Sequence, residues 1–182
     1  MKFEKVPALE GVRVFSADVS LDTRGTTIKN RPNQDFIDPL DSILLSINPR
    51  IGTIRGLHFQ TKPNAEEKLV TCVQGAVYDV VLDLRPDSST FGKWASVELN
   101  RENNLSVYLP HGIAHGFQTL IPDSIIHYCI TSTYSPDTSY SIKPIGEIAI
   151  SWPIDDYIIS DRDRDGISIE IGLKIYANSL KH

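Results

Sequence analysis

Short runs in which hydrophobic and polar residues alternate dominate the chain, and no long stretch has the period of an amphipathic helix. Because neighbouring side chains of a strand point to opposite faces, this alternation predicts β-strands. The runs follow one another at intervals of about 8–12 residues, which is typical of sandwiches and barrels. They occupy residues 12–15, 43–47, 68–73, 77–84, 95–99, 106–109, 114–120 and 125–132.

Residues that favour turns separate these runs, among them Pro63, Pro86, Gly92, Pro122 and Pro136. Residues 35–40 are compatible with one short helical turn, and the end of the chain combines a short acidic segment with an apolar run at 167–175. We expect one domain over 1–182: N-terminal strands at 1–50, a barrel at 51–150 and a C-terminal extension at 151–182.

Composition narrows the class of protein. The chain has 182 residues, of which 41% are hydrophobic, enough for one core. Its net charge of −5 argues against a nucleic-acid partner, which requires a basic face. No apolar run approaches the ~20 residues of a membrane span, and the N-terminus does not resemble a secretory signal. We therefore expect a soluble, cytoplasmic protein with no membrane partner, in which Cys72 and Cys129 are buried thiols.

Two segments concentrate side chains that can do chemistry: RGLHFQ at 55–60 and PHGIAHGF at 110–117. The spacing Pro-x-Gly-x-x-His in the second resembles the second motif of the cupins, and the first segment resembles the first cupin motif. Together with the strand pattern they predict an all-β, cupin-like antiparallel jelly-roll barrel with N-terminal strands and a C-terminal extension. Gln60 stands where metal-binding cupins carry a second histidine, so we expect no metal. A site of His58, Gln60, Glu67 and His115 is the metal-binding alternative.

With their flanking residues, these segments resemble the dTDP-4-dehydrorhamnose 3,5-epimerase family over roughly residues 20 to 165. The order and spacing of many separate matches carry the resemblance. They comprise RGLHFQ, Lys68-Leu69-Val70, Gly75, Asp79, Asp83-Leu84-Arg85, Ser88, Thr90-Phe91-Gly92, Trp94, the second motif, Tyr128, and Tyr134 with Pro136.

The resemblance implies an epimerase of nucleotide-linked 4-keto-6-deoxy sugars that inverts C3, C5 or both without a cofactor. In such sugars the protons next to the ketone are acidic, because the carbanion delocalises onto the ketone oxygen. A base with a pKa near neutrality is favoured, which suits imidazole. By the resemblance His58 is the base, Tyr128 returns a proton to the opposite face, and Asp163 orients the base. The alternative interpretation of Asp163 is that it belongs to a solvated acidic loop.

The resemblance also implies a set of substrate contacts and an assembly. Lys68 would stabilise the enolate charge, and arginines suit the oxygens of a diphosphate. The alternative interpretation of Tyr134 is that it is an ordinary half-buried aromatic residue. The family forms homodimers that share N-terminal strands, so we expect a homodimer. The expected substrate-binding residues are Arg24, Arg55, Lys68, His115, Tyr134 and Arg162.

Some positions differ from the family pattern. Thr26 and Thr27 replace aromatic residues, Lys29 replaces an acidic residue, and Ser139 replaces a glutamate. These positions leave the nucleotide, the sugar and the number of inverted centres undetermined. Two other functions remain: a 3,4-ketoisomerase of the same fold, and a non-catalytic cupin that binds a sugar nucleotide.

Overall fold

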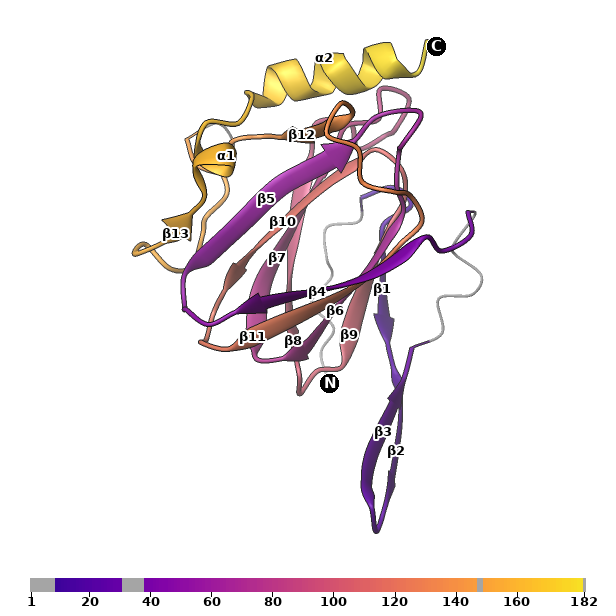
Figure 1. Ribbon diagram of the computed structural model, residues 1–182, viewed down its shortest axis with the longest axis vertical. Helices are drawn as coiled ribbons and strands as arrows, with labels where there is room; N and C mark the ends of the chain where they lie inside the picture. The colour runs from indigo at the N-terminus through magenta and orange to yellow at the C-terminus, as the bar shows by residue number, and fades with distance from the viewer. Residues whose placement is uncertain (1–8, 31–37, 147–148, 182) are drawn as a thin grey trace.

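Two β-sheets face each other in the computed structural model, which describes residues 9–30, 38–146 and 149–181 (Figure 1). Neighbouring strands of the first sheet are antiparallel, which is typical of strands with an alternating sequence pattern. In order across that sheet they are β1 (Arg13–Ser16), β9 (Leu105–Leu109), β6 (Lys68–Gln74), β11 (Ser124–Ile130) and β4 (Ser42–Asn48).

The second sheet is also antiparallel along its main path, and a short parallel strand, β13 (Ile158–Ile159), joins its β5. The two sheets confirm the predicted all-β, antiparallel jelly-roll barrel. In order the strands of the second sheet are β12 (Ser139–Ser141), β5 (Thr53–Gln60), β10 (Ile113–Thr119), β7 (Ala76–Asp83) and β8 (Trp94–Asn100).

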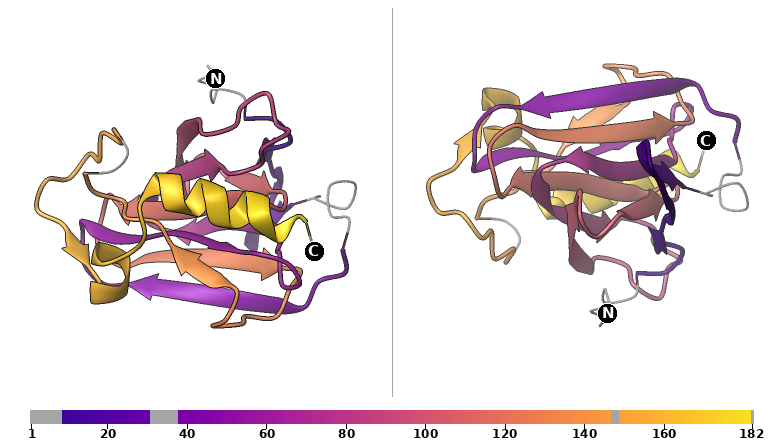
Figure 2. Two further views of the ribbon diagram at one scale, coloured as in Figure 1. Left: turned by 90° about the horizontal axis from the view of Figure 1, so that it is seen from above. Right: turned by 90° about the horizontal axis from the view of Figure 1, so that it is seen from below.

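Alternate side chains of these strands supply two hydrophobic cores. Inward-facing residues such as Val70 and Phe117 fill the space between the sheets. The opposite face of the second sheet, with Leu57 and Leu82, is covered by the C-terminal segment and Tyr176. Figure 2 shows the C-terminal helix lying across this sheet. The second sheet is therefore buried on both faces, whereas the first is buried mainly on its inner face.

The C-terminal extension contains two helices that the sequence pattern did not predict, α1 (Asp161–Arg164) and α2 (Ile169–Ser179). The apolar residues in the first two turns of α2 fall at 169, 171, 173 and 175, a period of two that is typical of a strand. The helix forms because Ser168 caps its first turn by accepting a hydrogen bond from the Ile171 amide, and because Tyr176 is buried against the sheet. Capping and tertiary packing override the local alternation.

A two-stranded hairpin, β2 (Asp18–Asp22) and β3 (Gly25–Lys29), projects away from the barrel (Figure 1). It is part of the expected N-terminal strands. The helical turn expected at residues 35–40 lies mostly outside the described residues. Among the described residues, no helix is both long and apolar enough to cross a membrane.

Candidate active site

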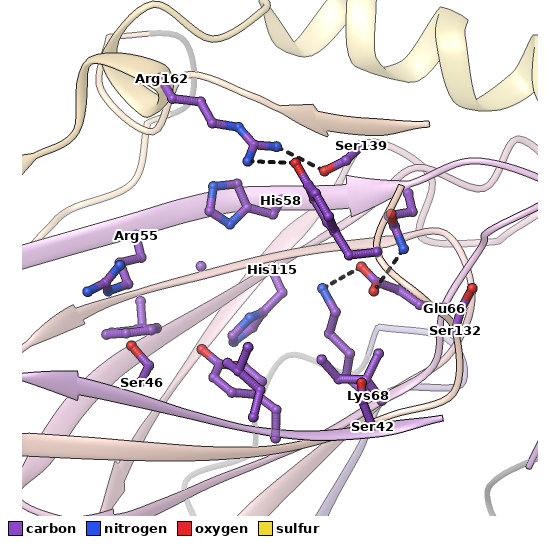
Figure 3. A pocket seen from close by; sticks show the side chains of 17 residues that line it. Ser42, Ser46, Arg55, His58, Glu66, Lys68, His115, Ser132, Ser139 and Arg162 are labelled. Carbon is purple, nitrogen blue, oxygen red and sulfur yellow. Dashed lines mark hydrogen bonds and ion pairs between the residues drawn. The ribbon is translucent and has the colours of Figure 1, made fainter. Parts of the chain in front are cut away.

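A pocket of about 330 Å³ lies between the two sheets, and both sheets contribute to its wall (Figure 3). His58 on β5 and His115 on β10 are directly opposite each other in the ladder of the second sheet. Lys68 on β6 and Tyr128 on β11 reach the pocket from the first sheet. The barrel thus brings together side chains far apart in the sequence and places them on two facing walls.

His58 is paired with a buried carboxylate behind it. Its Nε2 lies 2.6 Å from Oδ1 of Asp163, which also accepts a hydrogen bond from the Ser141 hydroxyl at 2.8 Å. The Gly56 amide donates to Oδ2 at 3.1 Å. Burial opposes the charge on Asp163, but the hydrogen bonds from His58, Gly56 and Ser141 outweigh it and lower its pKa to about 2.

This pairing defines which nitrogen of His58 can act as a base. A carboxylate that accepts from Nε2 fixes the tautomer with its proton on Nε2, so the lone pair resides on Nδ1. In the described part of the chain, Nδ1 has no hydrogen-bond partner, and the ring lines the pocket. Asp163 would also stabilise the imidazolium that forms when Nδ1 takes a proton.

The close approach of β5 and β10 depends on Gly56, two residues before His58. Its φ of 101° lies in the region that favours glycine. A Cβ there would lie 2.5 Å from the His115 carbonyl oxygen and 2.7 Å from Cα of Gly116. The glycine of the RGLHFQ motif therefore lets the two strands meet closely and presents its amide to Asp163.

Tyr128 faces the histidines from the first sheet, and its side chain is almost wholly buried. Burial raises the pKa of its phenol, and the charge of Asp79 raises it further. The hydroxyl therefore stays protonated at neutral pH and can donate a proton. The His115 ring packs edge-on against the Tyr128 ring, with 5.9 Å between the two ring centroids. The Nε2 atom of His115 lies 2.7 Å from Oδ2 of the fully buried Asp79.

Polar groups surround the rest of the pocket. Arg55 Nε donates to Oδ1 of Asn48 at 2.8 Å. At the edge of the pocket, Arg162 donates to the Ser139 hydroxyl at 2.9 Å and to the Tyr134 hydroxyl at 3.4 Å (Figure 3). Two cations are therefore held near the histidines by neutral hydrogen-bond partners.

The pocket brings together most of the side chains that the sequence predicted. Arg24 is not among them: it lies at the exposed tip of the β2–β3 hairpin, where it pairs with Asp22 at 2.7 Å. Asp163 lies directly behind His58. The predicted residues that line the pocket are Arg55, His58, Lys68, His115, Tyr128, Tyr134 and Arg162.

Sequence reasoning assigned no role to several residues that support the site. The sequence did indicate that Asp79 is unusual, because this carboxylate shares one strand face with Val77 and Val81, which point into the core. The sequence indicated a role for Glu66 more weakly, since Glu66 precedes Lys68 by two residues and can lie on the same face of the chain as Lys68. No sequence pattern indicated a role for Ser141, because only the folded chain brings it to Asp163.

The metal-binding alternative is not supported by these contacts. Its carboxylate ligand, Glu67, does not line the pocket and instead accepts hydrogen bonds from the Tyr108 hydroxyl and the Asp38 amide. The Gln60 amide nitrogen donates to the Thr133 carbonyl at 3.3 Å. The four residues proposed for that alternative therefore do not converge on one point.

A jelly-roll barrel with an imidazole–carboxylate pair on one wall and a protonated phenol on the facing wall places the chain in the class of cupin-type proteins whose pocket holds groups suited to proton transfer. The comparison with known families is consistent with that class. The chain belongs to the dTDP-4-dehydrorhamnose 3,5-epimerase family, whose family model matches residues 7–170.

Individual relatives agree with this membership. A dTDP-4-dehydrorhamnose 3,5-epimerase of Sinorhizobium fredii is 45% identical over 120 residues, which span 65% of this chain and 62% of that protein. A dTDP-4-dehydrorhamnose 3-epimerase of Streptomyces niveus is 36% identical over 166 residues, or 87% of this chain and 80% of that protein. A crystal structure of the Bacillus anthracis 3,5-epimerase with TDP and PPi bound has a TM-score of 0.83 at 35% identity, covering 91% of this chain and 99% of that one.

Proposed function

We propose that the chain is an epimerase that inverts C3, C5 or both centres of a nucleotide-linked 4-keto-6-deoxy sugar. The observation that carries this proposal is the placement of His58, backed by Asp163, and Tyr128 on opposite walls of one pocket. Inversion requires a base on one face of the sugar ring and an acid on the other, and the two sheets provide that arrangement.

The chemistry follows from the groups present. Nδ1 of His58 takes the proton from the carbon next to the ketone, and the electron pair of that C–H bond moves onto the ketone oxygen. The Lys68 ammonium stabilises the enolate charge. Tyr128 then gives its hydroxyl proton to the opposite face of the same carbon, and solvent restores both side chains. The product is an isomer of the substrate, so no oxidant or reductant is consumed.

The substrate class is supported by the cations at the pocket and by the relatives. Arg55 and Arg162 can bind the oxygens of a diphosphate. The Bacillus anthracis relative has TDP bound. Named relatives include both 3,5-epimerases and a 3-epimerase, which is why the proposal covers one or two centres. Thr26, Thr27 and Lys29 stay the positions that bear on nucleotide choice.

The decisive experiment is an NMR time course in deuterated water with a panel of nucleotide-linked 4-keto-6-deoxy sugars. We expect deuterium to enter at C3, C5 or both as the centre inverts, and His58→Asn to abolish this exchange. Movement of the ketone from C4 to C3 would instead identify a ketoisomerase. Binding without exchange at any carbon would identify a non-catalytic sugar-nucleotide-binding protein.

We also propose that the chain works as a homodimer. The outer side of edge strand β4 exposes Ile43, Leu45 and Ile47 by 67%, 57% and 64%, an apolar row that a second copy would bury. Each such side chain contributes ~1.5–3 kcal/mol when fully buried. In such a dimer the projecting hairpin can carry Arg24 to the partner, which would give this exposed arginine the substrate contact that the family resemblance implies.

Light scattering tests the assembly directly. We expect the dimer mass at micromolar concentration, and Leu45→Asp should give monomers. A matched control is Leu180→Asp, because that leucine is exposed at the end of α2, which packs on the second sheet, whereas β4 is an edge strand of the first. A monomer mass for the unaltered chain would refute the homodimer.

The proposed compartment is the cytoplasm. Cys72 and Cys129 are unpaired thiols, which is typical of reducing compartments. Cell fractionation would test this location, and recovery of the chain from a periplasmic or secreted fraction would refute it.

A further inference from the structure

Two charged side chains of the pocket wall form an ion pair whose carboxylate has no part in the proposed reaction. Nζ of Lys68 lies 2.7 Å from Oε1 of Glu66, and only 11% and 13% of the two side chains are exposed. Both residues line the pocket that contains His58 (Figure 3). Water screens an exposed pair of this kind, but a shielded pair leaves an uncompensated charge when one partner is removed. The position of the ammonium is therefore coupled to Glu66.

Glu66 is itself held in place. The Gln60 side-chain amide donates to Oε2 of Glu66 at 3.2 Å and to the Asn64 carbonyl at 3.1 Å. The Gln60 side-chain oxygen accepts a hydrogen bond from the Ser135 amide at 2.8 Å. Gln60, at the position where metal-binding cupins have histidine, therefore connects the Glu66–Lys68 pair to the backbone at Asn64 and Ser135.

The location of Lys68 in the sheet indicates what the hydrogen bonds from Gln60 to Glu66, and the ion pair from Glu66 to Lys68, can do. Lys68 lies opposite Ile130 in the ladder between β6 and β11, and Val70 lies opposite Tyr128. Residues two apart on a strand share a face, so Lys68 and Tyr128 both point into the barrel and are diagonal neighbours. The ammonium and the phenol thus enter the pocket from the same face of the first sheet, and in the proposed reaction the ammonium reaches the enolate oxygen from that face.

We propose that Glu66 is a positioning residue, which holds the Lys68 ammonium toward the enolate oxygen; this inference rests on the proposed epimerase function. Lysine has a flexible four-carbon stem and loses rotamer freedom when it is fixed. Without the carboxylate the ammonium can turn toward water. The same change leaves the pocket with one more net positive charge, which attracts the diphosphate of the nucleotide.

Loss of Glu66 therefore has two effects of opposite sign. Turnover falls because Lys68 is misplaced, whereas affinity for a nucleoside diphosphate rises because a nearby negative charge is gone. A residue that only maintained the fold would lower both when removed. This split between kcat and binding is the signature of positioning.

The test uses Glu66→Gln, Lys68→Met and the double variant, with kcat from the exchange assay and the Kd of thymidine diphosphate from calorimetry. We expect Glu66→Gln to lower kcat about 10-fold through misplacement. It should tighten thymidine diphosphate about 2- to 3-fold, as expected for one charge removed at screened distance. In the Lys68→Met background, Glu66→Gln should lower kcat no further, because coupled residues are not additive.

The matched control is Glu170→Gln on α2, which removes the same charge from an exposed pair with Lys174 and should change neither quantity. Equal losses of kcat in both backgrounds, or weaker diphosphate binding in Glu66→Gln, would overturn the role of Glu66. If the unaltered chain exchanges no deuterium with any sugar of the panel, the proposed function fails. In that case the calorimetric titrations with thymidine diphosphate are the remaining test of the role of Glu66. An unchanged Kd in Glu66→Gln would then refute the inference.

Discussion

The Asp163→Asn variant tests whether His58, the proposed base, must be oriented by Asp163 as well as be present. Asparagine has the size of aspartate, but it replaces one acceptor oxygen by a donor NH₂. In the native site Oδ1 accepts from His58 and Ser141, and Oδ2 accepts from Gly56. If the new NH₂ faces His58, Nε2 must become the acceptor and the proton moves to Nδ1, which can then no longer take a proton. If the NH₂ faces Gly56 instead, the NH₂ and the Gly56 amide are both donors, and the hydrogen bond between these two residues is lost.

The structure gives the size of the effect on stability. The pKa of Asp163 falls from 3.8 to about 2 on folding, and its side chain is 5% exposed, so solvent screening is weak. That difference corresponds to about 2 kcal/mol of stability at pH 7. Because the folded pKa is the lower one, the contribution is complete above pH 4 and is lost as the pH falls toward 2.

Two assays follow from these values. Urea unfolding of the unaltered chain and of Asp163→Asn should differ by about 2 kcal/mol at pH 7, and the difference should shrink between pH 4 and pH 2. Deuterium exchange should fall about 10²-fold, less than in His58→Asn, because the imidazole is retained. Asp161→Asn is the matched control, since Asp161 lies in the same helix but forms an exposed pair with Arg164. A wild-type exchange rate in Asp163→Asn would refute its role in orienting His58.

Three further changes test separate parts of the site. Tyr128→Phe should keep some deuterium exchange with retention and lose inversion, as NMR would show, because it removes the proposed acid and leaves the proposed base. Inversion at the wild-type rate would make Tyr128 a packing residue. Gly56→Ala should lower the unfolding free energy by at least about 1–3 kcal/mol and reduce exchange, because a Cβ meets the His115 backbone. Gly25→Ala, with a φ of 130° but open space, is its control, and equal losses in both would contradict the clash. Burial raises the pKa of Cys72 to about 11, so its alkylation at pH 8 should be far slower in the folded than in the unfolded chain; equal rates would contradict its burial.

The alternation of residues in most of the runs by itself indicated the all-β fold, because period-two burial is a local property of a strand with one buried face. Strands β5 and β10, in the sheet that is buried on both faces, do not show it. The strands at 68–73 and 77–84 were placed within one residue of β6 and β7 at both ends. Candidate site residues could also be named, since His58 and His115 lie in compact motifs with characteristic spacing. Resemblance to a family supplied Tyr128 and Asp163, which no local pattern distinguishes.

Only the tertiary structure decided what the named residues contact. It placed Asp163 behind His58, 105 residues away in sequence, and paired His115 with the buried Asp79. It made a helix of residues 169–179, whose alternation is typical of a strand, because burial of Tyr176 and the Ser168 cap outweigh the local pattern. It also put Arg24 on a projecting hairpin instead of in the pocket. Periodicity records which face of a segment is buried, whereas partners depend on how distant strands align across the barrel.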